Sequence, residues 1–264
     1  MTGALFDRLP DGSYLPAALT RGGWSDDAQH GSPPSGLMAH AVEDVPVAGP
    51  MEVARFTIDL FRPVPLTPLR VETDVRRDGK RIQVVEVRLS AEGVEVGQVS
   101  ALRVRRGVVG LDRSPTDLLE PGPERLTVLD WREAFGGSPG LERFHTDGVE
   151  IRTIDDSFVR PVPGRSWFRL LHPVVAGEAV SPFVRAATLA DMANGNSQVL
   201  DPRRYLYVNP DTTLYLHRQP DGEWLGMQST AFQGPEGVGM VDTALYDRSG
   251  RVGHVVQAQL LEER

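Results

Sequence analysis

The sequence VGQVSALRV (residues 96–104) returns 156 positions later as VGHVVQAQL (residues 252–260). The same offset aligns residues 57–104 with residues 213–260 without a gap, and it pairs identical residues such as Thr57 with Thr213. Similarity at a fixed period indicates repeated structural units. The chain is therefore predicted to contain two copies of one unit, and differences between the copies should indicate which half carries the function.

The composition excludes several classes of partner and chemistry. The chain has 264 residues, no cysteine and a net charge of -8. Nucleic acid binding requires a cationic surface, and a membrane span requires about eighteen consecutive apolar residues, which this sequence lacks. Without cysteine there is no disulfide or thiolate chemistry, and no histidine pair has the HExxH spacing of zinc enzymes. We expect no metal, no cofactor, no nucleic acid and no membrane, and a cytoplasmic location because no signal peptide is visible.

Both copies contain predicted strands. Segments rich in β-branched and leucine residues predict them at residues 70–75, 82–89, 97–104, 224–232, 238–246 and 252–261. Asp78-Gly79 and Glu92-Gly93 supply turns in the first copy, and glycine-containing segments at residues 234–237 and 247–250 do so in the second.

A helix is predicted ahead of each set of strands. Residues 33–44 follow Ser32, which is expected to be the N-cap because its side chain can accept from a free backbone N–H. Residues 182–194 follow the N-cap Ser181, and Gly195 is expected to end that helix.

A segment rich in proline and glycine joins the copies and reads as a long surface connection. The predicted organisation is an N-terminal unit at residues 1–107, a linker at residues 108–140 and a C-terminal unit at residues 141–264.

A helix wrapped by an antiparallel sheet, twice in one chain, is the double hotdog arrangement, an α+β fold. The chain also resembles the acyl-CoA thioesterase II-like (TesB-like) family of double hotdog proteins. Four segments carry the resemblance: HGSPPSGLMAHAV (residues 30–42), LFRPV (60–64), LYLHRQP (214–220) and VGHVVQAQL (252–260). Each segment is short, so their order and spacing carry the match, which covers almost the whole chain except the linker.

The resemblance implies a site that activates water without a metal, a cofactor or a covalent nucleophile. In the family, an Asp on the second central helix, a polar residue on the next strand and a Gln on the last strand hold the water. The matching positions here are Asp191, Asn209 and Gln257. Asn209 departs from the usual Thr, so Thr212 and Thr213 stay open as the third group. A carboxylate can deprotonate the water, and N–H donors can stabilise the charge that develops on the thioester oxygen.

The repeat favours a single site in the second half. Gln257 aligns with Ala101 and Asn209 aligns with Val53, so the first half lacks two of the three polar groups, although Glu43 takes the place of the helix carboxylate.

Each predicted catalytic residue also has an ordinary structural interpretation. Asp191 would then be a solvated helix charge, Gln257 a strand residue that faces solvent, and Asn209 a turn residue before Pro210.

The start of the first helix is the predicted substrate-binding region. Gly31 would let a ligand approach the backbone, where free N–H groups attract a thioester oxygen, and Gly36 would give the same access one turn later. His30 either contacts the ligand or has a structural role. Candidates for the CoA phosphates are Arg62, Arg203, Arg204 and Arg218.

The predicted function is hydrolysis of an acyl-CoA thioester to a free acid and CoA. The alternative is a non-catalytic acyl-thioester or fatty-acid binding protein on the same scaffold, and a role in assembly is a third hypothesis. The acyl chain, the choice between CoA and a carrier protein, and the formation of a homo-oligomer stay open.

Overall fold

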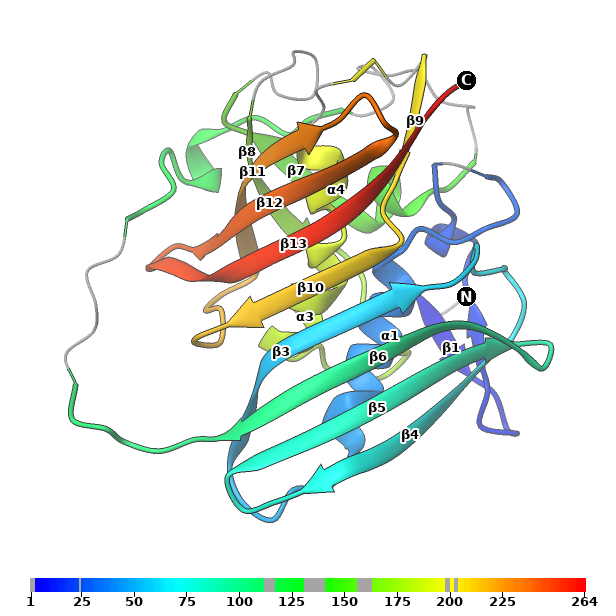
Figure 1. The fold of residues 1–264 in the computed structure, drawn as a ribbon, viewed down its shortest axis with the longest axis vertical. Coiled ribbons are helices and arrows are strands. Elements are labelled where there is room, and N and C mark those ends of the chain that lie inside the picture. The colour runs from blue at the N-terminus through cyan, green and yellow to red at the C-terminus, as the bar shows by residue number, and fades with distance from the viewer. Residues whose placement is uncertain are drawn as a thin grey trace.

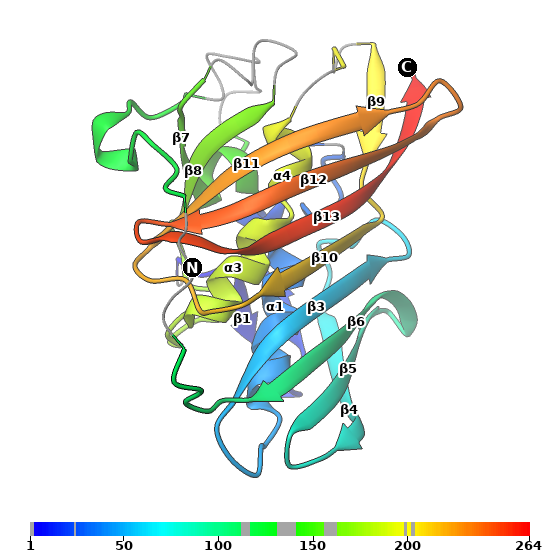
Figure 2. The ribbon, with the colours of Figure 1, turned by 60° about the vertical axis from the view of Figure 1, so that its left-hand side comes forward.

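The computed structural model describes residues 3–23, 25–111, 117–130, 141–155, 163–197, 200–201 and 204–264. Within these residues, thirteen strands form one sheet that curves around two central helices (Figures 1 and 2). The order is β1-β2-β4-β5-β6-β3-β10-β13-β12-β11-β8-β7, and β9 pairs with β13. This is the α+β double hotdog that the sequence predicts.

The first half of the sheet contains β1 (Phe6–Arg8), β2 (Tyr14–Pro16), β3 (Met51–Leu60), β4 (Leu69–Asp78), β5 (Ile82–Ala91) and β6 (Val94–Arg105). The second half contains β7 (Val149–Thr153), β8 (Gly164–Leu170), β9 (Tyr205–Val208), β10 (Asp211–Leu216), β11 (Trp224–Gln233), β12 (Val238–Asp247) and β13 (Gly250–Glu263). The six predicted strands are present as β4, β5, β6, β11, β12 and β13. The Glu92-Gly93 turn joins β5 to β6 with positive φ angles of 51° and 78°.

The two halves meet where β3 pairs with β10, at an approximate two-fold axis. Thr57 lies opposite Thr213 in this antiparallel pair, and their hydroxyl oxygens are 3.3 Å apart. These residues are equivalent in the sequence repeat, so the register places each copy of the strand against the other at the same residue. The structure thus confirms the repeat and its offset.

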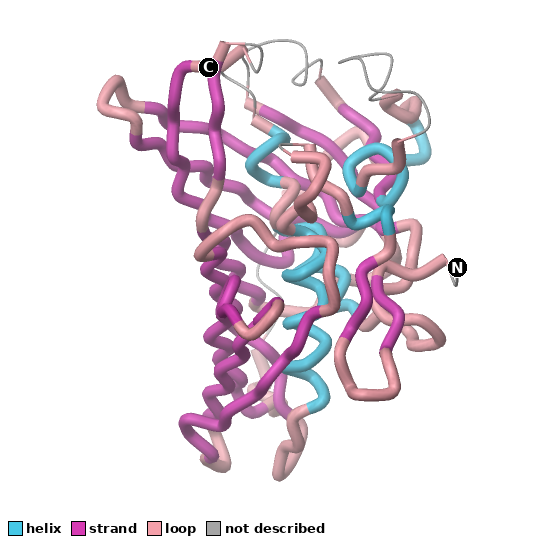
Figure 3. The backbone as a smooth tube through the Cα atoms, turned by 90° about the vertical axis from the view of Figure 1, so that its right-hand side faces the viewer, coloured by secondary structure: helices cyan, strands magenta, loops and turns pink. Residues whose placement is uncertain are grey.

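The central helices are α1 (Ser32–Asp44) and α3 (Pro182–Ala190), which pack against each other on one face of the sheet (Figure 3). They run in opposite directions, because the hydroxyl of Ser35, near the start of α1, donates to the carbonyl of Ala187 near the end of α3 at 2.9 Å. Each helix therefore ends close to the start of the other. Short helical turns are η1 (Ala18–Thr20), η2 (Pro123–Arg125) and η3 (Phe144–Gly148).

Two details of the predicted helices are wrong. The second helix does not continue to Asn194: α3 ends at Ala190, and the chain turns at residues 191–192 before the short helix α4 (Ala193–Asn196), which contains Gly195. Ser32 is the first residue of α1 and makes no cap hydrogen bond. By contrast, Ser181 is the N-cap of α3 and accepts from the N–H of Val184 at 3.0 Å.

The predicted boundaries of the two units stay predictions. β6 ends at Arg105 and β7 begins at Val149, and residues 112–116 and 131–140 between them lie outside the described residues. In the described part of the chain, no helix is long and apolar enough to cross a membrane.

Candidate active site

Four segments converge where α3 ends. They are the start of α1, the turn after α3, the residues that precede and open β10, and the middle of β13. Asp191 occupies the turn after α3, and only 6% of its surface is exposed. The antiparallel packing of the helices places this carboxylate beside the start of α1. The interpretation of Asp191 as a solvated helix charge is therefore wrong.

Three side chains contact the carboxylate of Asp191. Nδ2 of Asn209 donates to Oδ1 at 2.7 Å, and the hydroxyl of Ser32 donates to Oδ2 at 3.3 Å. Nδ1 of His30 lies 2.9 Å from Oδ2. Ser32 thus begins the helix with its hydroxyl turned toward Asp191 instead of capping the helix.

The pKa of Asp191 results from two opposing effects. Burial would raise it, because a charged carboxylate loses its hydration. The hydrogen bond and charge of His30, followed by the hydrogen bonds of Asn209 and Ser32, outweigh burial and hold the pKa below its usual value of 3.8. Asp191 is therefore an ionised carboxylate at neutral pH.

The position of His30 assigns its tautomer. The backbone nitrogen of Ser32 also lies 3.1 Å from Nδ1, but one nitrogen cannot accept from Ser32 and donate to Asp191 at once. An unprotonated Nδ1 would point its lone pair at a carboxylate 2.9 Å away, so we assign the hydrogen to Nδ1. The ring packs against Phe144 with centroids 5.3 Å apart, and 18% of the His30 side chain is exposed.

Gln257 and Thr212 extend the cluster onto the sheet. Gln257 is fully buried, and its Nε2 donates to the hydroxyl of Thr212 at 2.8 Å and to the backbone carbonyl of Asp191 at 3.5 Å. Nδ2 of Asn209 lies 3.5 Å from the same hydroxyl. Within the described residues, Oε1 of Gln257 has no hydrogen-bond partner. The site therefore contains a buried acceptor without a donor.

The three predicted residues Asp191, Asn209 and Gln257 thus lie in one cluster, and the structure adds Thr212 to it. Thr213 is not part of it, because its hydroxyl meets Thr57 at the junction of the halves. Successive strand residues point to opposite faces, which separates Thr212 from Thr213. The alternative interpretation, in which Gln257 faces solvent, is wrong, since its exposure is 0%.

The two predicted glycines have different surroundings. A Cβ atom at Gly31 would lie 2.8 Å from both carboxylate oxygens of Asp191, so glycine is required for the carboxylate to come this close. A Cβ atom at Gly36 would lie 2.3 Å from the hydroxyl oxygen of Thr188 on α3. The space beside Gly36 is therefore filled by the partner helix, and a packing role replaces the expected ligand contact.

The start of α1 offers fewer donors than the sequence analysis expects. Pro33 and Pro34 have no N–H, and the N–H of Ser32 points at the ring of His30. The N–H of Gly31 has no acceptor among the described residues. One backbone donor beside Asp191 is thus free for a ligand oxygen.

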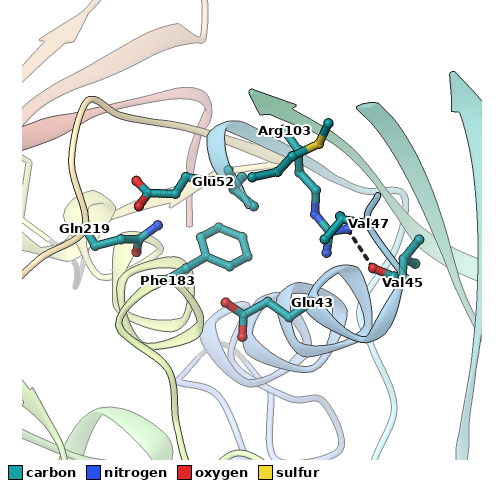
Figure 4. Close-up of a pocket in the computed structure, with 9 residues that line it drawn as sticks. Glu43, Val45, Val47, Glu52, Arg103, Phe183 and Gln219 are labelled. Carbon is teal, nitrogen blue, oxygen red and sulfur yellow. Dashed lines mark hydrogen bonds between the residues drawn. The ribbon is translucent and has the colours of Figure 1, made fainter. Parts of the chain in front are cut away.

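The first half contains a counterpart of this site (Figure 4). Glu43 lies at the end of α1 and accepts a hydrogen bond from the side chain of Ser181 at the start of α3, as Asp191 does from Ser32. Burial raises the pKa of Glu43. The carboxylate borders a pocket of about 230 Å³, and Val53 stands there in place of an amide.

Arg103 also lines that pocket. Its guanidinium donates to the carbonyls of Val42 and Val45 at the end of α1, the latter at 2.8 Å, and to Oε1 of Gln83 at 2.9 Å. At the positions equivalent to Asn209 and Gln257, the first half has Val53 and Ala101, which cannot hold a water by an amide or a hydroxyl.

One of the predicted phosphate contacts can be judged. Arg218 binds both carboxylate oxygens of the buried Asp247, so its side chain is already occupied. Arg203 lies outside the described residues. Within the described chain, no three side chains of the metal-binding type converge.

The sequence analysis does not foresee that His30 and Ser32 bind Asp191. It gives His30 either a ligand contact or a structural role and Ser32 a role as helix cap, and it leaves Thr212 open as the third polar group. His30 and Ser32 are far from Asp191 in the sequence, so no local pattern indicates that they touch. The only feature of the sequence that could have indicated these contacts is the expected packing of the two central helices.

Comparisons with known proteins place this geometry in context. A model of the acyl-CoA thioesterase N-terminal domain matches residues 20–104, and a model of the acyl-CoA thioesterase C-terminal domain matches residues 123–261. No curated protein matches the chain at a significant level.

Solved structures share the fold at low sequence identity. A hot dog fold protein of unknown function from Alicyclobacillus acidocaldarius is 15% identical, with a TM-score of 0.74 over 95% of this chain and 92% of that one. The acyl-CoA thioesterase II TesB2 from Mycobacterium marinum is 15% identical, with a TM-score of 0.67 over 98% of this chain and 95% of that one. At such identities, the likeness shows the fold alone.

Proposed function

The chain belongs to the acyl-CoA thioesterase family, and from that premise we propose that it hydrolyses an acyl-CoA to a free acid and CoA with water held by Asp191, Thr212 and Gln257. The observation that carries the proposal is the buried cluster at the end of α3. There, an ionised carboxylate lies beside an amide oxygen that accepts from no donor among the described residues.

The hydrogen-bonding inventory of the cluster suits one water molecule. A water has two hydrogens, which Asp191 and Oε1 of Gln257 can accept. The hydroxyl of Thr212 accepts from Gln257 and faces Asn209, so its own hydrogen is available to the water oxygen. One lone pair of the water then remains for attack on a carbonyl carbon.

The other groups fit the later steps of the reaction. As the new C–O bond forms, negative charge moves to the thioester oxygen, and the free N–H of Gly31 can donate to it. The water's proton passes to Asp191, because Nδ1 of His30 already carries the hydrogen that faces this carboxylate. The intermediate then expels the CoA thiolate as the C–S bond breaks, and the thiolate recovers a proton from Asp191 or from solvent.

The role of Asp191 in the reaction follows from its lowered pKa. A general base is most effective when its pKa is near the working pH. An aspartate whose pKa lies below 3.8 is a weak base, so its main contribution is to orient the water while Nδ1–H of His30 holds its carboxylate in place.

The test is hydrolysis of acyl-CoA thioesters of different chain lengths, followed by a colorimetric assay of free CoA thiol. Asp191→Asn is expected to lower kcat by about 10²- to 10⁴-fold, the usual contribution of a positioned acid or base. The matched control is Glu43→Gln, which removes the counterpart carboxylate in the first half and is expected to leave kcat within about twofold.

This assay and a measurement of acyl-CoA binding together distinguish the alternative functions. Saturable binding of acyl-CoA without turnover would support a binding protein on this scaffold, and the absence of both would leave a role in assembly. Equal loss in Glu43→Gln and Asp191→Asn would contradict a single site in the second half. A cytoplasmic location remains part of the proposal, and self-association stays a prediction.

A further inference from the structure

The interior beside the candidate site is unusually polar. Asn196, Ser166, Ser229 and Thr243 each have 0% exposure, and they lie between α4 and the inner face of the second half of the sheet. We call these four residues the α4 polar cluster. At the aligned position of the first half, Val87 stands in place of Thr243. Buried polar groups are normally hydrogen-bonded, so this cluster requires partners.

Part of the cluster is satisfied within the protein. Nδ2 of Asn196 donates to the carbonyl of Gly164 at 3.2 Å and to the hydroxyl of Ser229 at 2.9 Å. The hydroxyls of Thr243 and Ser229 are 2.9 Å apart. Exchanging the amide nitrogen and oxygen of Asn196 would turn its oxygen against the carbonyl of Gly164. These contacts therefore fix the orientation of the amide.

Two atoms of the cluster have no partner in the described part of the chain. They are Oδ1 of Asn196 and Oγ of Ser166. Ser166 faces the same side as Asn196, because Trp167, the next residue, packs in a separate cluster with Leu119 on the other face of β8. An amide oxygen can only accept, so the missing partner of Asn196 must be a hydrogen-bond donor.

The position of the cluster relates it to the site. Asn196 lies five residues after Asp191, and its N–H donates to the carbonyl of Met192 in a helical turn. The turn at residues 191–192 and the short helix α4 separate the two side chains along the chain. Oε1 of Gln257, the unpartnered acceptor of the site, lies on the same inner face of the sheet. The α4 polar cluster and the candidate site therefore share the inner face of the second half of the sheet.

We propose that the acyl group of the substrate carries a hydroxyl group, and that this hydroxyl donates to Asn196 and contacts Ser166. The inference rests on the proposed function, since it places the thioester carbonyl at Asp191. A plain aliphatic chain in the same place would leave both atoms without a partner, and a site that binds a substrate hydroxyl disfavours the analogue that lacks it.

The test measures binding, so that it does not depend on turnover. The probes are CoA thioethers in which a methylene group separates the sulfur from the carbonyl. One carries a plain hexanoyl group, and the others carry a hydroxyl at carbon 3, 4, 5 or 6. Isothermal titration of the wild-type protein is expected to give at least one hydroxylated probe a Kd about tenfold below that of the plain probe, which is about 1.4 kcal/mol.

The variants locate the contact. Ser166→Ala removes a hydroxyl that binds no described protein group, so the fold should tolerate it, and it should reduce the preference for the hydroxylated probe. Asn196→Ala should abolish the preference. Thr67→Val is the matched control, because Thr67 also has a partnerless hydroxyl but lies in the first half.

Equal binding of all probes by the wild-type protein would overturn the inference, as would a preference that survives both Ser166→Ala and Asn196→Ala. If Asn196→Ala does not fold, Ser166→Ala against Thr67→Val decides. Failure of the proposed function has a different signature, which is an absence of thioester hydrolysis whatever the pattern of binding.

Discussion

The substitution Gly31→Ala tests the geometry of the site with one added methyl group. The backbone of Gly31 has a φ of -63° and a ψ of -26°, which alanine adopts without strain. The new Cβ atom, however, would lie 2.8 Å from both oxygens of Asp191 and 2.9 Å from its carboxyl carbon. The substitution therefore acts on Asp191 and not on the backbone of residue 31.

The size of the effect follows from the distance. An ordinary contact begins near 3.4 Å, so the carboxylate must move by about 0.6 Å. It is held by Asn209 at 2.7 Å and by His30 at 2.9 Å, and such a shift stretches or breaks these bonds. A misplacement of 1 Å can cost about 10²-fold in rate, so we expect kcat to fall by about tenfold to a hundredfold. KM should change less, because the substrate contacts remain.

The assay is thiol release from acyl-CoA, with circular dichroism to show that the variant is folded. Gly195→Ala is the control, since it is also a helical glycine and a Cβ atom there would meet nothing within 4 Å. In an Asp191→Asn background, Gly31→Ala should have little further effect, because both changes act on one group. A folded Gly31→Ala variant with full activity would refute the assignment of Asp191.

Three further outcomes are expected for stability. Gly36→Ala should lower the free energy of unfolding by about 1–3 kcal/mol through overpacking against Thr188, measured by urea denaturation, and Thr188→Ala should restore part of the loss. Asp247→Ala should lower it by about 3–5 kcal/mol, because the change leaves the partly buried guanidinium of Arg218 without its partner, and a smaller loss would show that Arg218 finds other acceptors. Burial raises the pKa of Asp247, but Arg218 and two backbone N–H groups outweigh it and hold this pKa below its usual 3.8. The stabilisation by Asp247 is therefore present above pH 3.8 and is lost as the pH falls through the pKa of the folded state. The difference in unfolding free energy between wild type and Asp247→Asn should narrow below about pH 4.

The architecture could be predicted because it repeats. One offset aligns both halves, and the structure pairs Thr57 with Thr213 across the junction, as two copies related by a two-fold axis require. The predicted strands alternate buried and exposed residues or end at glycine turns, which are local signals. β3 and β10 are not predicted as strands, although each also pairs within its own half, β3 with β6 and β10 with β13. The pairing of β3 with β10 across the junction joins segments far apart in the sequence and leaves no local signal.

The candidate site was only partly predictable, for a related reason. Asp191, Asn209 and Gln257 follow from the resemblance and from the differences between the copies. The contacts of His30 and Ser32 with Asp191 depend on how two helices from different halves pack. The turn at residues 191–192 also escaped prediction, because helix propensity favours continuation through this segment. Tertiary contacts with α1 and β13 hold the turn, which places the carboxylate against both.

The two ends of the helix pair explain why one site suffices. Duplication placed a carboxylate at the end of each central helix, and each lies next to a serine at the start of the other helix. In the second half, amides and a hydroxyl surround the carboxylate, and its pKa is lowered. In the first half, Arg103 donates to the helix carbonyls instead, and burial raises the pKa of Glu43. A carboxyl group with a raised pKa is mostly neutral where Asp191 is ionised, and Val53 and Ala101 stand at the positions of the two amides of the second half. The two acids therefore differ in their chemistry because their neighbouring side chains differ, while the backbone that carries them is the same in both halves.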